Sequence, residues 1–256
     1  MSEINNYLGN SITPKITNQN SVQNKKTLIL PISLWITLLV VLIISVKKYK
    51  SCQDRIPLTY LILGFSIVSF VVLQLIYQYY DINVNSLLAF VLSIIFLVIT
   101  HIYKPNSKIN TLFFALFIIS FSFILQPLFK LGDKMGIAKP ALFTVCIWFL
   151  ILTLISVYYP NMITPQIKNI LFFSLIFLLI FRIILLFTKP LSKTIRISAY
   201  LGIIIFSGFV LYDSKMMRFR ASQCDHPYEY INNSIGLFLD FVNLWSDTMT
   251  LGVTRR

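Results

Sequence analysis

The feature that most constrains this chain is a succession of eight apolar runs, separated by short polar breaks. The runs cover residues 27–46, 57–79, 84–103, 111–130, 139–159, 168–188, 197–213 and 231–252. An α-helix needs about 20 apolar residues to cross a hydrocarbon layer about 30 Å thick. Lipid offers the backbone no water to bond, and the runs lack the alternation of barrel strands. They therefore predict membrane-spanning helices and an all-α polytopic membrane protein.

The composition agrees with a membrane protein and excludes a soluble enzyme, a disulfide scaffold and a disordered chain. Only 12% of the residues are charged and 57% are hydrophobic, whereas soluble domains carry about 25% charged residues. The net charge of +13 comes from Lys and Arg in the breaks, so we expect basic loops and a lipid bilayer as partner, with no nucleic acid. The three cysteines, Cys52, Cys146 and Cys224, have no metal-ligand spacing, and we interpret them as small or incidental residues.

The chain divides into a tail, one isolated helix and a seven-helix domain. Residues 1–26 are polar, without apolar periodicity, and predict a flexible tail. The run 27–46 starts too far into the chain for a secretory signal and is expected to remain as a membrane helix. Residues 57–252 hold the other seven runs. Lys and Arg divide almost evenly between the two sides if all eight runs span, so the positive-inside rule leaves the orientation open.

Ionisable groups inside membrane segments are costly, so they mark candidate functional residues. The runs contain His101, Arg182, Asp213, Asp240 and Asp247. We interpret Arg182, in the middle of its run, as an arginine that snorkels or pairs with a carboxylate to fix helix packing. We interpret His101, at the end of its run, as an interfacial residue.

The aspartates of the last two runs predict a polar pair. Asp240, Asn243 and Asp247 are spaced i, i+3 and i+7, so a helix places them on one stripe that faces a protein interior or a wet cavity. Asp213, at the end of the preceding run, is the natural partner of Asp240. Two buried carboxylates close together cannot both ionise cheaply, so such a pair shares a proton. The residues leave open whether the pair is a proton-dependent switch, a cation site or an acid–base dyad.

Two motifs occur here in the order typical of a known family. An apolar helix ends in Tyr212-Asp213-Ser214, and a final segment after a short basic loop contains Gly236-Leu-Phe-Leu-Asp240-Phe-Val-Asn243-Leu. Together they resemble the transmembrane Bax inhibitor motif family, the Bax inhibitor and lifeguard superfamily. The resemblance covers residues 57–252 and implies a seven-helix bundle with its last helix at the centre. The run 27–46 is then an extra N-terminal transmembrane helix.

The resemblance also implies a function. In that family two aspartates form a pH-sensitive latch that controls a calcium leak, and eukaryotic members suppress cell death from endomembranes. By this resemblance the chain is a pH-sensitive calcium leak channel of the endoplasmic reticulum or Golgi, gated by Asp213 and Asp240. Calcium is the transported ion, in transient contact with both aspartates, and no cofactor is implied.

The same resemblance assigns supporting residues. Asn243 and Asp247 continue the polar stripe beside the latch. Family members often carry a basic residue at the end of the second core helix that can pair with the latch. Here that region contains His101 and Lys104, and Arg182 is a third candidate basic partner.

Two other interpretations stay open. A non-conducting membrane protein with the same motifs would inhibit apoptosis by binding membrane proteins that regulate cell death. An intramembrane aspartyl protease also pairs aspartates on successive helices, but its second Asp belongs to a Gly-x-Gly-Asp motif followed by Pro-Ala-Leu. Here Phe238-Leu239 precedes Asp240, and Pro140-Ala141-Leu142 comes before Asp213. We therefore expect no enzymatic activity.

Overall fold

The computed structural model describes residues 19–48, 55–82, 84–164, 166–188, 191–224 and 229–255. They form eight α-helices and one short 3₁₀ helix: α2 (Gln19–Lys48), α3 (Arg55–Tyr79), α4 (Ser86–Ile102), α5 (Lys108–Lys134), α6 (Ala138–Tyr158), η1 (Pro160–Met162), α7 (Ile167–Phe187), α8 (Ser192–Gln223) and α9 (Tyr230–Arg255). Helices α3, α5, α6, α7 and α8 are long and apolar enough to cross a membrane, and α2 and α4 contain shorter apolar segments. The predicted all-α polytopic membrane fold is confirmed.

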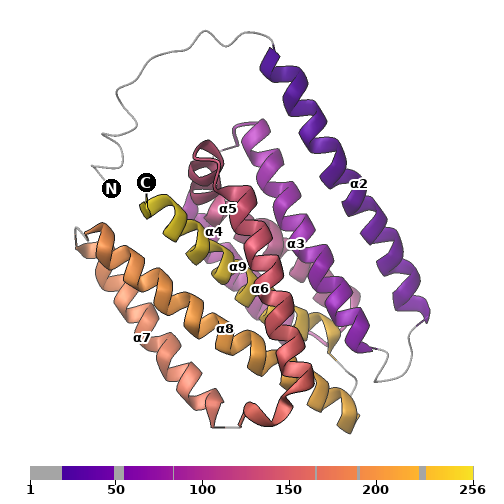
Figure 1. The fold of residues 1–256 in the computed structure, drawn as a ribbon. Helices are drawn as coiled ribbons and strands as arrows, with labels where there is room; N and C mark the ends of the chain where they lie inside the picture. The colour runs from indigo at the N-terminus through magenta and orange to yellow at the C-terminus, as the bar shows by residue number, and fades with distance from the viewer. Residues whose placement is uncertain are drawn as a thin grey trace.

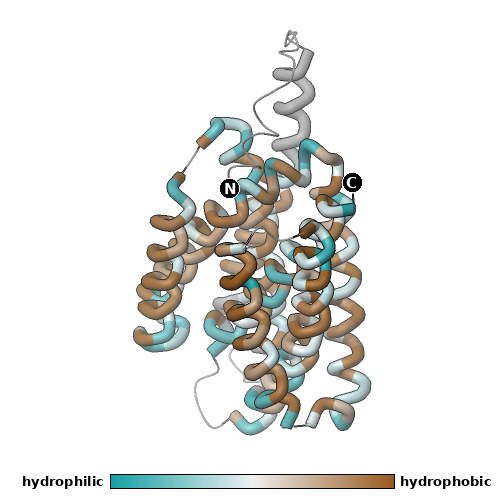
Figure 2. Tube along the Cα trace, turned by 90° about the vertical axis from the view of Figure 1, so that its left-hand side faces the viewer, coloured by the Kyte–Doolittle hydropathy of each residue, from teal (hydrophilic) through white to brown (hydrophobic). Residues whose placement is uncertain are grey.

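Helix α9 runs through the middle of the bundle (Figure 1) and packs against α3, α5, α6 and α8. On the outside, α2 packs on α3, α4 on α5, and α7 on α8. Hydrophobic residues cover most of the length of the helices, and hydrophilic residues gather in the turns and at the helix ends (Figure 2). The last run lies within one continuous helix of 26 residues, α9, which is about 39 Å long.

Aromatic side chains fix the apolar face of α9. Phe238 is fully buried, and its ring makes edge contacts with Phe70, Phe117 and Phe121 at centroid distances of 6.2 to 6.3 Å. Trp245, two turns further along, packs edge-on against Phe70 at 5.3 Å. Since these rings come from α3 and α5, they hold this side of α9 against those helices, and the stripe that carries the aspartates faces the other way.

Polar contacts fix the start of α9. The side-chain amide of Asn110 in α5 donates to Asn232 Oδ1 at 3.2 Å and to the Thr100 carbonyl oxygen at 2.7 Å. The Ser234 hydroxyl, which is fully buried, donates to the carbonyl oxygen of Thr59 in α3 at 3.0 Å. The start of α9 is thereby tied directly to α3 and α5, and through Asn110 to α4.

Helix α2 docks on the outside of α3 through an aromatic contact. Trp35 stacks on Phe65 at 5.6 Å and its indole nitrogen donates to Ser69 Oγ at 2.8 Å. The helix begins at Gln19, before the apolar run, because no glycine or proline interrupts residues 19–30. Residues 1–18 of the predicted tail lie outside the described residues.

One interpretation of the cysteines is wrong. Cys224, in a left-handed conformation at the end of α8, is disulfide-bonded, whereas Cys146 is free and exposed on α6. Cys52 lies outside the described residues. An odd number of cysteines still allows one pair, and spacing along the chain does not show which segments the fold brings together.

Candidate functional site

Asp213 and Asp240 lie at the same depth on two antiparallel helices. Helix α8 continues to Gln223, so Asp213 lies inside this helix rather than at its end, ten residues before the last. The helix extends because residues 214–223 contain no glycine or proline. Asp240 lies ten residues after Tyr230, the first residue of α9. At 1.5 Å per residue, both aspartates lie about 15 Å from the same end of the bundle.

Both carboxyl groups line a single cavity between α7, α8 and α9. Its volume is about 320 Å³. The other polar lining residues are Arg182 and Asn243, and the remainder are apolar: Leu175, Leu178, Leu179, Phe206, Phe209, Gly236 and Leu239. An apolar wall with a few convergent polar groups is the usual composition of a ligand or ion site.

Gly236 makes room for the Asp213 carboxyl group against α9. A Cβ atom at this position would lie 3.0 Å from Asp213 Oδ2, so the Asp213 side chain rests where α9 has no side chain. Gly236 and Asp240 are one helical turn apart and share a face of α9. Asp240 is only 6% exposed, and its Oδ2 has no hydrogen-bond partner among the described residues. Most buried polar atoms in proteins have a hydrogen-bond partner, so the unpaired Asp240 Oδ2 makes this residue a candidate functional group.

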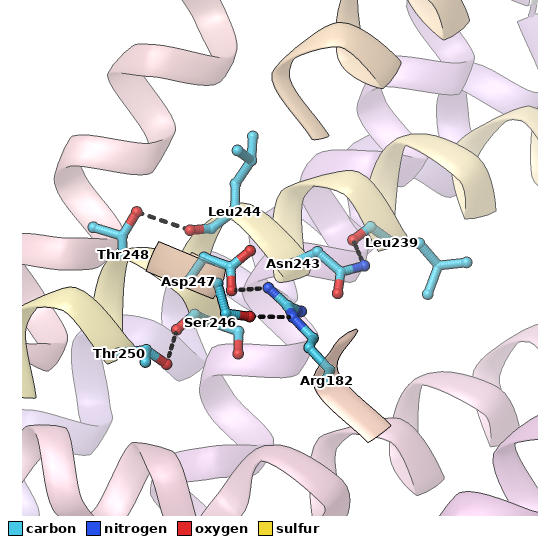
Figure 3. Close-up of polar contacts among 9 residues, drawn as sticks. Arg182, Leu239, Asn243, Leu244, Ser246, Asp247, Thr248 and Thr250 are labelled. Atoms are coloured by element: carbon cyan, nitrogen blue, oxygen red, sulfur yellow. Dashed lines mark hydrogen bonds and ion pairs between the residues drawn. The ribbon is translucent and has the colours of Figure 1, made fainter. Parts of the chain in front are cut away.

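Asp247 is part of a second charged layer. It is only 3% exposed, and its Oδ1 lies 2.5 Å from an η nitrogen of Arg182 (Figure 3). The Arg182 Nε donates to Ser198 Oγ in α8 at 3.3 Å. Asp247 follows Asp240 by seven residues, about 10 Å along α9. The site therefore contains two layers: the Asp213 and Asp240 pair, and the Arg182 and Asp247 ion pair.

Gly202 makes room for the second layer on α8. A Cβ atom at this position would clash with Asp247 Oδ2 and would lie 2.5 Å from the Arg182 η nitrogen. The absence of a side chain at residue 202 lets the ion pair lie directly against the backbone of α8. Arg182 of α7 and Asp247 of α9 thus meet across the helix between them.

A comparison with known protein families matches residues 52–250 to the family described as inhibitor of apoptosis-promoting Bax1. The chain belongs to this family. The match covers more than three quarters of the chain, includes both aspartates of the first layer and starts after α2. A comparison with curated proteins finds no match.

Two basic residues proposed from the Bax inhibitor resemblance do not line the cavity. His101 and Lys104 are exposed at the end of α4 and in the turn that follows. The Nδ1 of His101 lies 2.9 Å from the Leu97 carbonyl oxygen of its own helix. Of the three candidate basic partners, Arg182 alone lines the cavity, and its ion pair is with Asp247 rather than with Asp213 or Asp240.

Sequence reasoning missed Gly202 and Ser198 in this Bax inhibitor family member. A signal was present, because Ser198 and Gly202 have the small-xxx-small spacing that lets membrane helices approach closely. The spacing shows that α8 has a close neighbour but not which one, and here the neighbours are the Arg182 and Asp247 side chains.

The described residues of this Bax inhibitor family member contain no group of three His, Cys, Asp or Glu side chains that could hold a metal ion. Calcium in resident protein sites takes six to eight oxygen ligands. The two carboxyl groups of the cavity can supply at most four of these.

Proposed function

We propose that this membrane protein is a pH-sensitive calcium leak channel of intracellular membranes, gated by Asp213 and Asp240, and that it suppresses cell death. The observation that carries the proposal is the convergence of two carboxyl groups on one cavity beside the central helix, where one Asp240 oxygen is buried without a hydrogen-bond partner among the described residues. Membership of a family named for inhibition of a cell-death protein supports the second part.

The physics of a carboxyl pair explains a response to pH. When the pair holds one proton, the two groups can share it, and α8 and α9 stay together at this layer. When both groups are ionised they repel each other, which favours separation of the helices, and they attract a divalent cation into the space between them. Calcium flux should therefore be greater with both groups ionised than with a shared proton.

The charged groups that surround the pair are few. Helix α7 contributes Arg182, α9 contributes Asp247, and Arg220 in the last turn of α8 interacts electrostatically with Asp213. Lys215 and Arg218 of α8 bond instead to the Ile163 carbonyl oxygen and to the Ser156 hydroxyl. The charged residues of α3, α5 and α6 lie in their terminal turns, away from this depth. Within the described residues, the titration of Asp213 and Asp240 is thus the simplest source of a pH response.

The experiment is calcium flux into liposomes that contain the purified protein and a trapped calcium dye, between pH 5 and pH 8. Asp213→Asn and Asp240→Asn each keep the side-chain size and remove the like-charge repulsion, so either variant should make the flux nearly independent of pH. Asp133→Asn is the matched control, since Asp133 accepts a hydrogen bond from Gln78 at the end of α5 and does not line the cavity.

Two results would contradict the proposal. No flux from wild-type protein at any pH would favour a non-conducting inhibitor of apoptosis that acts by binding other membrane proteins. A wild-type pH response in both aspartate variants would mean that other groups gate the leak.

The expected location is the endoplasmic reticulum or Golgi, which co-localisation of the tagged protein with organelle markers would check.

A further inference from the structure

The second charged layer has no role in the pH latch, although Arg182 lines the same cavity as both latch aspartates. We propose that the Arg182 and Asp247 ion pair is a second gate in series with the latch. In this gate, the arginine holds a positive charge at the far end of the cavity, and calcium passes when the arginine swings aside. This inference rests on the proposed calcium leak.

Burial distinguishes the two partners. The Asp247 side chain is 5% exposed, on the central helix, whereas the Arg182 side chain is 33% exposed, on the outer helix α7. Arginine also has a long side chain that can carry its charged head toward water while its stem stays in place. Arg182 is therefore the partner that can move, and Asp247 stays in place and binds it again when the gate closes.

The contact itself leaves room for movement. Arginine and carboxylate can form two parallel hydrogen bonds, but here the guanidinium reaches one oxygen, Asp247 Oδ1, and its Nε reaches Ser198. The second oxygen, Asp247 Oδ2, is buried with no hydrogen-bond partner among the described residues. When Arg182 moves away, this oxygen can therefore bind the passing cation. The same carboxylate thus holds the arginine in the path while the gate is closed and contacts the cation when it is open.

The charge of Arg182 gives the gate its selectivity. A fixed positive charge in a narrow path excludes cations, and the repulsion of a divalent ion is twice that of a monovalent ion at the same distance. Asp247 offsets part of this charge. Removal of the arginine should therefore raise calcium flux, whereas removal of the aspartate leaves an uncompensated arginine and should lower it.

Opposite effects separate a gate from a packing contact. Arg182→Gln and Asp247→Asn break the same ion pair, so if the pair only held the helices together, both variants would change the leak in the same direction. For a gate, we expect Arg182→Gln to raise calcium flux by about fivefold or more and Asp247→Asn to lower it by a similar factor, the usual lower range of coupling between sites. Arg182→Gln should also raise the ratio of calcium to potassium flux.

The test is the same liposome assay with calcium and potassium dyes, applied to the full chain. Arg218→Gln is the matched control, because Arg218 also bonds across helices, to Ser156 Oγ of α6 at 2.9 Å, but does not line the cavity. Arg182→Lys keeps the positive charge and should keep the low flux. Gly202→Ala introduces a Cβ atom against the ion pair without a change in charge, and should raise the leak as Arg182→Gln does.

The outcomes are distinct. Absence of a wild-type leak refutes the proposed function and, with it, the gate. A wild-type leak that changes in the same direction in Arg182→Gln and Asp247→Asn, or in neither, overturns the gate and leaves the latch proposal intact. If Arg182→Gln does not fold, Asp247→Asn decides alone: a lower leak supports the gate, and an equal or higher leak refutes it.

Discussion

Phe238 holds the central helix in place, and its replacement by alanine should destabilise the protein by about 3 kcal/mol. The ring is completely buried and makes edge contacts with Phe70, Phe117 and Phe121. An aromatic pair contributes about 0.5–1.5 kcal/mol beyond burial, and a buried Phe→Ala change costs about 3–5 kcal/mol in soluble proteins. In lipid the transfer part is smaller, because lipid is as apolar as the core, so we expect the lower end of this range.

The assay is thermal unfolding of the purified protein in detergent, followed by circular dichroism. For a chain of this size 1 kcal/mol corresponds to about 2–4 °C, so Phe238→Ala should lower Tm by about 6–12 °C. Phe177→Ala is the matched control, because Phe177 is 62% exposed on α7 and its ring stacks on Phe181 of the same helix. The control should shift Tm by no more than about 2 °C. Equal shifts in both variants would refute the view that packing of rings around α9 stabilises the bundle.

Three further predictions concern other parts of the fold. The Lys130 ammonium lowers the pKa of Asp81, and a lowered pKa adds stability at neutral pH that is lost as the pH falls through it; Asp81→Asn should therefore lower Tm slightly at pH 7 and by less as the pH falls below the ordinary pKa of aspartate. Deletion of residues 1–46 should leave a folded, conducting core, as monodisperse gel filtration and unchanged calcium flux would show. Gly236→Val should push Asp213 away from α9 and weaken the response of the flux to pH, whereas an unchanged response would contradict the close approach at this glycine.

The sequence predicts the fold well because lipid restricts the choice. A run of 20 apolar residues between polar breaks has almost no alternative to a helix in a bilayer, and two helices joined by a short loop are antiparallel neighbours. Asp213 and Asp240 lie at equal distances from the short loop that joins α8 and α9, so their common depth follows from the sequence. The ends of the helices were harder to predict, since polar residues without glycine or proline extend α2 and α8 beyond their apolar runs.

The second layer of the site could not be predicted from the sequence in the same way. Arg182 and Asp247 are 65 residues apart, and no periodicity relates a residue of α7 to one of α9. Asp247 lies near the end of its apolar run, yet the neighbouring helices bury it. His101 and Lys104 match the family pattern by position, but α4 packs on α5 and both side chains are exposed. Such pairings depend on which sides of the helices are in contact, and the packing of the whole bundle decides this.

The central position of α9 constrains how the protein is made. This helix carries two buried aspartates, each of which costs about 2.5–3.5 kcal/mol for insertion at the middle of a membrane, and it is not among the helices apolar enough to span on their own. The helices that surround it, α3, α5, α6 and α8, all precede it in the chain. They are therefore synthesised first, and α9 can pack between them only afterwards. A ribosome that stops before residue 230 therefore releases a set of membrane helices without the helix that joins them.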